Sequence, residues 1–367
     1  MRANQSSINK ITVVLFFIIL FLISVSQLIL PDKEISQAER RRLEQMPKVT
    51  SNAIMERELT DKLEKYLLDQ FPARDQFLKS DAFVKQVVFQ RQDIGGVYQY
   101  KTYLSKVLFP EKTNDIAYIT NKINTICETY LSGMPIFMTM VPDKGYFTAD
   151  RSGKPHIDYD AFESELKSKL NTSLKYVSLL DSLHLEDYYK TDAHWRQEAL
   201  EPVVKVLNKE MSNPTTENSI VYDNLGEFKG VYYDKLFNTT EPDQLITVKV
   251  PGWETAIVTY ADEKKVAAIY RLDMLDHLDR YDTFLGGPQS LVYIENDAAQ
   301  TDKELVMFRD SFGSSIAPWF IQTYKKITLI DLRYVDVDKL NQYVSFSNQD
   351  ILFLYNTTVL NNKINFK

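Results

Sequence analysis

Three side chains of this sequence have the chemistry for acyl transfer: Asp192, His194 and Ser311. Asp192 and His194 lie in YYKTDAHWRQEAL (residues 188–200), and Ser311 lies in RDSFGS (residues 309–314). A serine hydroxyl is a weak nucleophile until a base removes its proton, and a carboxylate fixes the tautomer of that base. We therefore take Ser311 as the candidate nucleophile, His194 as the base and Asp192 as the acid that orients it.

Each motif also has an ordinary structural explanation. An Asp-x-His sequence is common, and Asp310 or Ser311 could simply cap a helix. Trp195 is expected to pack rather than to bind substrate, although it stays a candidate for substrate contact. His184 is an alternative base, just upstream in DSLHLED. The two remaining histidines lie in polar stretches and fit the role less well: His156 and His277.

The elements that must position these residues alternate along the chain from about residue 100. Apolar strands are predicted at residues 135–141, 174–181, 303–308, 326–332 and 351–355. Helices are predicted at residues 159–170, 196–211 and 315–324. This alternation is typical of an α/β fold with a parallel sheet, in which functional groups sit at the C-terminal ends of strands. Both motifs follow predicted strands, so we expect them to meet at one edge of the sheet.

Between about residues 213 and 300 the alternation gives way to strand-like runs such as QLITVKV, AIVTY and SLVYI. These runs predict a β-containing insertion within a main domain that covers residues 100–367. Residues 31–99 carry apolar residues at helical spacing, which predicts a helical juxtamembrane segment.

The first thirty residues contain an uncharged apolar run at residues 11–30, preceded by Arg2 and Lys10. At ~1.5 Å per residue such a run is long enough to cross a bilayer. The flanking charges predict a single-pass anchor, with residues 1–10 in the cytoplasm and residues 31–367 outside. The alternative is a signal peptide cleaved after Ser26, since residues 13–23 also resemble an apolar signal region.

Composition excludes several classes of function. The formal net charge of -7 argues against a nucleic-acid-binding face, which needs a basic surface. The one cysteine, Cys127, allows neither an intrachain disulfide nor a cysteine-based zinc site. The sequence has no H-E-x-x-H, G-x-G-x-x-G or P-loop motif, so we expect no metal and no cofactor.

The motifs together resemble the DHHW proteins of bacteria, which are similar in turn to the SGNH-type enzymes that O-acetylate alginate. YYKTDAHW and FRDSFGSSIAPWF carry the resemblance, and ISQAERRRL, DQFPARDQF, VPDKGYF, YDTFLGGPQSLVYI, ITLIDLRY and DILFLYN extend it over most of the chain. The resemblance implies a three-layer SGNH-hydrolase-like sheet with Ser311, His194 and Asp192 as catalytic residues. Ala193 stands where the family has its first histidine, a difference that bears on substrate contact because the D-x-H-W core is kept.

The resemblance further implies an oxyanion hole made by a glycine and an asparagine beside the N–H of the nucleophile. The candidates for these groups, each of which could equally be a turn residue, are Gly313, Gly286, Gly287 and Asn356. Arg309 and Trp195 are the other residues that we expect close to the substrate.

The function implied by the resemblance is that of an exported, membrane-anchored serine O-acetyltransferase or O-acetylesterase. Its expected substrate is a cell-surface polysaccharide, and its expected location is the bacterial cell membrane with the C-terminal domain outside. A membrane-bound O-acyltransferase is the expected source of acyl groups. The alternative is a non-catalytic scaffold or glycan-binding component of a cell-envelope assembly, which would keep the fold without the activity.

Overall fold

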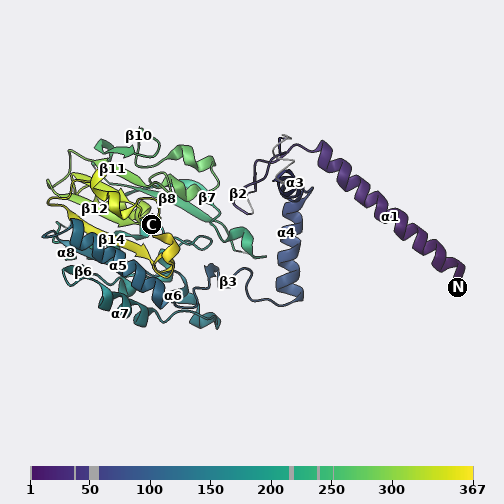
Figure 1. Cartoon of the computed structure of the whole chain (residues 1–367), viewed down its shortest axis with the longest axis horizontal. Coiled ribbons are helices and arrows are strands. Elements are labelled where there is room, and N and C mark those ends of the chain that lie inside the picture. Colours follow the sequence, from purple (N-terminus) through teal and green to yellow (C-terminus); the bar gives the residue numbers. More distant parts are fainter. Residues whose placement is uncertain are drawn as a thin grey trace. The chain divides into compact units, whose positions relative to one another are not determined.

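The computed structural model describes residues 2–36, 39–48, 58–214, 219–237, 240–250 and 252–366. The chain divides into two compact units. The first comprises residues 1–91 with residues 234–237, and the second comprises the rest of the chain. Figure 1 labels many of their helices and strands, and each unit is described here by itself.

The first unit begins with one long helix, α1 (Arg2–Ile29). Within it, Ser7–Ile29 is long and apolar enough to span a membrane. Its further elements include two short antiparallel strands, β1 (Ile35–Ser36) and β2 (Arg41–Arg42), and two α-helices, α3 (Glu58–Asp69) and α4 (Arg74–Phe83). A π-helical segment, Val84–Val88, follows α4. The two strands lie where a helical segment was expected. The carboxylate of Asp69 joins them to α3, since it accepts hydrogen bonds from Arg41 and from the backbone of Glu44.

The second unit contains an eight-stranded sheet in the order β10-β9-β11-β13-β12-β14-β5-β6. Five neighbouring strands are parallel: β13 (Lys326–Ile330), β12 (Glu304–Arg309), β14 (Asp350–Asn356), β5 (Ile136–Val141) and β6 (Leu174–Tyr176). Three strands from the expected insertion extend the sheet with antiparallel pairing: β11 (Leu291–Glu295), β9 (Ile257–Tyr260) and β10 (Lys265–Ala267). The predicted α/β class with a largely parallel sheet is therefore confirmed.

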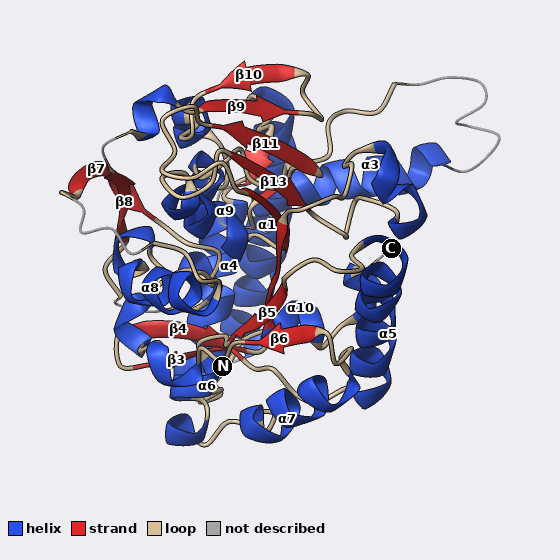
Figure 2. Ribbon diagram, turned by 90° about the vertical axis from the view of Figure 1, so that its left-hand side faces the viewer, coloured by secondary structure: helices blue, strands red, loops and turns tan. Residues whose placement is uncertain are grey.

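Helices cover both faces of this sheet, which gives three layers (Figure 2). One face carries α8 (Glu201–Glu210) and α9 (Phe312–Ile316), packed with Leu352 and Leu354 of β14. The opposite face carries α5 (Thr113–Tyr130) and α7 (Tyr159–Lys169), packed with Phe353 of the same strand. Because both faces are covered, every residue of β14 and β5 is buried, as their unbroken apolar sequences predict.

The smaller elements of the second unit complete its ends. β3 (Val97–Tyr100) pairs with β4 (Tyr103–Lys106), and β7 (Val221–Phe228) pairs with β8 (Asp243–Lys249), both in antiparallel fashion. The two short helices are α6 (Gly145–Thr148) and α10 (Thr357–Leu360). Two predicted boundaries were wrong. The strand expected at residues 174–181 ends at Tyr176 and continues as irregular turns. The helix expected at residues 315–324 begins at Phe312, directly after Ser311, and tightens into a 3-10 turn at Ala317–Phe320 that contains Pro318.

Candidate active site

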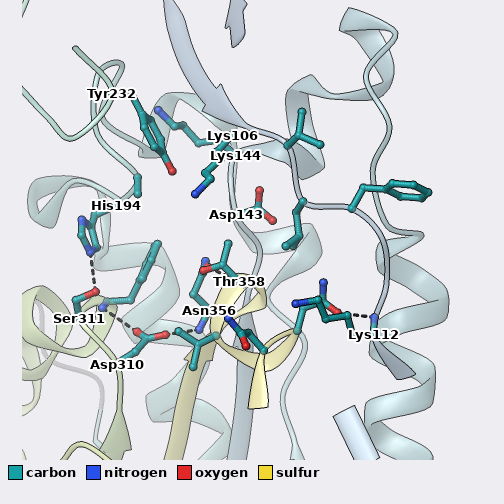
Figure 3. A pocket seen from close by; sticks show the side chains of 18 of the residues that line it. Lys106, Lys112, Asp143, Lys144, His194, Tyr232, Asp310, Ser311, Asn356 and Thr358 are labelled. Carbon is teal, nitrogen blue, oxygen red and sulfur yellow. Dashed lines mark hydrogen bonds between the residues drawn. The ribbon is translucent and has the colours of Figure 1, made fainter. Parts of the chain in front are cut away.

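Three parallel strands end at the same edge of the sheet and deliver polar residues there. β12 leads into Asp310 and Ser311, β14 ends at Asn356, and β5 leads into Asp143 and Lys144. A pocket of about 490 Å³ opens at this edge, and Figure 3 shows its walls. Its lining includes all five of these residues together with His194 and Tyr232. Ser311 directly precedes α9, so its side chain stands at a strand-to-helix turn.

Asp192, His194 and Ser311 form a continuous chain of hydrogen bonds. Nε2 of His194 lies 2.7 Å from Oγ of Ser311, and Nδ1 lies 2.5 Å from Oδ1 of Asp192 (Figure 3 shows the first of these). When Nδ1 donates its proton to the carboxylate, Nε2 accepts the hydrogen bond of the serine hydroxyl. The side chain of Asp192 is fully buried, whereas that of His194 is 11% exposed and borders the pocket.

The environment of Asp192 favours its ionised form. Burial by itself would raise the pKa of this carboxyl, but the contact with His194 and hydrogen bonds from the backbone N–H groups of Val231 and His194 lower it below its usual range. Oδ1 accepts from His194, and Oδ2 accepts from Val231. A permanently ionised carboxylate at this place can hold the imidazole in one tautomer and stabilise the imidazolium.

The ring of His194 is also held by aromatic contacts. Tyr281 stacks on it with ring centroids 3.8 Å apart and an interplanar angle of 11°, and Phe312 lies at 4.8 Å. The hydroxyl of Tyr281 donates to Oγ of Ser315. Nε1 of Trp195 donates to the same oxygen, which joins the histidine loop to α9. The structure therefore places Trp195 in a buried packing position next to the site.

Close backbone packing at Gly230 supports the same loop. A Cβ atom added to Gly230 would lie 2.3 Å from Cβ and 2.5 Å from Cα of Asp192. Its N–H donates to Oγ1 of Thr191. No side chain larger than hydrogen fits here without displacing Asp192.

The structure brings one of the other expected site residues into the pocket. Asn356 lines it, and its side-chain nitrogen donates to the backbone oxygen of Val141. Its Oδ1 accepts hydrogen bonds from the backbone and the hydroxyl of Thr358, so the side chain is fixed in one orientation. One of the two amide hydrogens remains for a ligand, which makes Asn356 the best placed of the expected oxyanion residues.

Within the described residues, the pocket lining does not include the remaining candidates. Arg309 is fully buried, with a guanidinium nitrogen 3.9 Å from the Asp331 carboxylate. The N–H of Gly313 donates to the carbonyl oxygen of Asp310 within the turn. Gly286 and Gly287 have positive φ angles, which identifies them as turn residues. The side chain of His184, the alternative base, is 74% exposed and faces Asp187 rather than Ser311.

Sequence reasoning did not single out several residues of the site. Lys144 and Asp143 lie in VPDKGYF, directly after a predicted strand, and this position could have identified them as residues of the site. Asp143 is buried, and burial raises the pKa of its carboxyl, which accepts hydrogen bonds from Tyr159 and Thr357.

Among the described residues, no group of three histidine, cysteine, aspartate or glutamate side chains is placed to hold a metal ion.

Comparison with known proteins gives a fold. No protein-family model matches the sequence, and no curated protein matches it. A DHHW family protein from Eubacterium siraeum matches with a TM-score of 0.60 and 21% identity, over 73% of this chain and 92% of that one. The chain has the fold of this DHHW family protein. The expected resemblance is thereby confirmed at the level of fold.

Two further solved structures match the chain. Bacillus cereus PatB1 does so with a TM-score of 0.59 and 18% identity, over 74% of this chain and 99% of that one. A second structure of PatB1 contains a sulfonyl adduct. The O-acetyltransferase domain of Pseudomonas putida AlgJ gives a TM-score of 0.44 and 10% identity, over 72% of this chain and 92% of that one.

Proposed function

We propose that this protein is an exported, membrane-anchored serine O-acyltransferase or O-acetylesterase that acts on a cell-surface polysaccharide. The observation that carries the proposal is the hydrogen-bonded series Asp192–His194–Ser311, with its serine end open to the pocket. A base within hydrogen-bond reach of a serine, itself oriented by a buried carboxylate, is the arrangement that activates a hydroxyl for attack on an acyl carbon. A scaffold would not need it.

The reaction follows from this geometry. Oγ of Ser311 attacks the acyl carbonyl while Nε2 of His194 takes its proton, and the imidazolium then protonates the departing oxygen to leave an acyl-serine. A sugar hydroxyl or water next gives its proton to His194 and attacks the acyl-serine, and the imidazolium returns a proton to Oγ of Ser311 as the ester or the free acid is released. We assign the backbone N–H of Ser311 and the amide of Asn356 as donors to the oxyanion of the tetrahedral intermediates.

The location and substrate rest on two supports. The apolar helix α1 is long enough to anchor the chain, and the charges before it favour an orientation with the second unit on the outer side of the membrane. The substrate class is proposed from the resemblance of the motifs around Asp192, His194 and Ser311 to the DHHW proteins, and a DHHW family protein shares the fold of this chain. A membrane-bound O-acyltransferase would deliver the acyl group, since acyl donors are made in the cytoplasm.

A sulfonyl fluoride tests the nucleophile directly. The full chain in detergent should gain one sulfonyl group on the peptide that contains Ser311, as measured by mass spectrometry, and the adduct should be absent from Ser311→Ala and nearly absent from His194→Ala. A folded wild-type protein without the adduct would refute serine chemistry and support a scaffold or glycan-binding role. With an aryl acetate and an oligosaccharide acceptor, the ratio of acetylated sugar to free acetate then separates transferase from esterase.

A further inference from the structure

Lys144 is a buried lysine for which the acyl-transfer chemistry gives no role. It is 2% exposed, whereas lysine is almost never fully buried unless paired. Its ammonium nitrogen donates to the backbone oxygens of Tyr189, at 2.9 Å, and of Lys190, at 3.1 Å. Figure 3 shows the amine of Lys144 directed into the pocket, on the side that carries His194.

The carboxylate of Asp243 binds the N–H groups of the same stretch of backbone. Its carboxylate accepts from the backbone of Lys190 at 2.7 Å, and from the backbone and hydroxyl of Thr191 at 2.8 and 2.5 Å. Asp243 begins β8 and is 8% exposed. A buried amine thus donates to the carbonyl groups of this stretch, and a buried carboxylate accepts from its N–H groups.

The segment held in this way is the acid–base loop, which we define as residues 189–194. Tyr189 donates from its backbone N–H to the carbonyl oxygen of His194, so the loop is closed at its ends. Buried backbone groups must be paired, and a charged partner makes a stronger hydrogen bond than a neutral one. Lys144 and Asp243 bind the backbone of residues 189–191, which directly precede Asp192.

We propose that Lys144 and Asp243 are positioning residues that fix the acid–base loop and thereby align His194 with Ser311. This inference rests on the proposed function for its catalytic consequence. Lys144 extends from the end of β5 and Asp243 from the start of β8, so the loop is fixed from two separate elements. Neither side chain needs to touch the acyl group for this role.

The rate at which a sulfonyl fluoride modifies Ser311 measures the alignment. Displacement by about 1 Å can reduce a rate roughly 100-fold, so Lys144→Met and Asp243→Asn should each lower kinact by roughly 10- to 100-fold. For Asp243→Asn, KI should stay within about twofold, because Asp243 is not among the residues that line the pocket. The double variant should lose less than the product of the two single losses, since both residues fix one loop.

Two control variants replace a lysine and an aspartate that are also largely buried but do not bind the acid–base loop. Lys154 has a side chain that is 8% exposed and pairs with Asp93. Asp350 is also 8% exposed, and it accepts hydrogen bonds from Lys303 and Tyr324. Lys154→Met and Asp350→Asn should therefore keep the wild-type kinact even where they lower the melting temperature.

A spectroscopic measurement separates this inference from the proposed function. The imidazole proton between His194 and Asp192 should give a downfield NMR signal in the wild-type protein that is absent from His194→Ala. It should shift or broaden in Lys144→Met and Asp243→Asn, but not in the controls. Wild-type rates and an unchanged signal in both test variants would overturn the positioning role. Should Lys144→Met fail to fold, Asp243→Asn alone decides. Absence of wild-type labelling would instead refute the proposed function, and the NMR signal would still test the positioning of the loop.

Discussion

At the scale of single residues, Asp192 and His194 differ in kind from Ser311 because they share one short loop. Their hydrogen bond is almost local, whereas the contact between His194 and Ser311 joins positions 117 residues apart. Substitutions in the loop should therefore change the state of the base, and substitution of the serine should remove the reacting atom itself.

We predict a graded loss of aryl acetate turnover when each of these three residues is substituted. Ser311→Ala should abolish acyl-enzyme formation, and His194→Ala should be nearly as severe, because an unassisted hydroxyl is a poor nucleophile. Asp192→Asn should lower kcat by orders of magnitude, with ~10⁴ known for such a change. His184→Ala is the control and should match the wild type. Loss of activity in His184→Ala with retention in His194→Ala would show that the base is misassigned.

The burial of Lys144 should also appear in the pH dependence of stability. Burial lowers the pKa of its amine from 10.5 to about 7, although Asp192, Asp243 and Asp143 oppose this change. Between these two values the unfolded chain binds more protons than the folded chain, so this group lowers the free energy of unfolding as the pH falls from about 10 to about 7. Denaturant titrations across this range should show a smaller decrease for Lys144→Met than for the wild type. Parallel curves for the two proteins would contradict this assignment.

At the scale of elements, Ser315 couples the histidine loop to α9. Its oxygen accepts hydrogen bonds from Trp195 and Tyr281, both of which are buried. Ser315→Ala should leave the buried hydroxyl of Tyr281 without its acceptor, whereas Nε1 of Trp195 keeps the carbonyl oxygen of Phe312 at 3.2 Å. The free energy of unfolding should fall by about 1–3 kcal/mol. The neighbouring Ser314 is a matched control, since its buried hydroxyl has no partner among the described residues. Ser314→Ala should therefore be close to neutral in the same denaturant titration.

The sequence contains the strand ends of the site but not the contacts between distant elements. β12 and β14 could be predicted because both are unbroken apolar runs followed by polar residues. The contact of Asp243 with the acid–base loop could not be predicted, because that loop lies about fifty positions upstream. Gly286 and Gly287 were placed too close to the site, because a glycine pair in sequence does not distinguish a turn from an oxyanion donor. The length of β6 was overestimated, because apolar residues that pack in irregular turns resemble a buried strand in sequence.

At the scale of the whole molecule, α1 contains a segment, Ser7–Ile29, that is long and apolar enough to span a membrane. If α1 is an uncleaved anchor, the full chain expressed in bacteria should stay with the membrane through high-salt and carbonate washes. Protease added to intact spheroplasts should digest the second unit, because the charges before α1 predict that it lies outside. Recovery of a soluble chain that begins at Gln27 would show instead that the segment is a signal peptide.

The position of β14 in the sheet has a consequence for biosynthesis. β14 is the last strand in the sequence, yet it lies between β12 and β5 and joins the two parts of the sheet. During synthesis and translocation, β12 and β5 therefore have no shared neighbour until residues 350–356 emerge. A nascent chain that ends before β14 would expose two unpaired strand edges and would lack an assembled pocket. Premature termination before residue 350 should thus yield a protease substrate rather than a weakened enzyme.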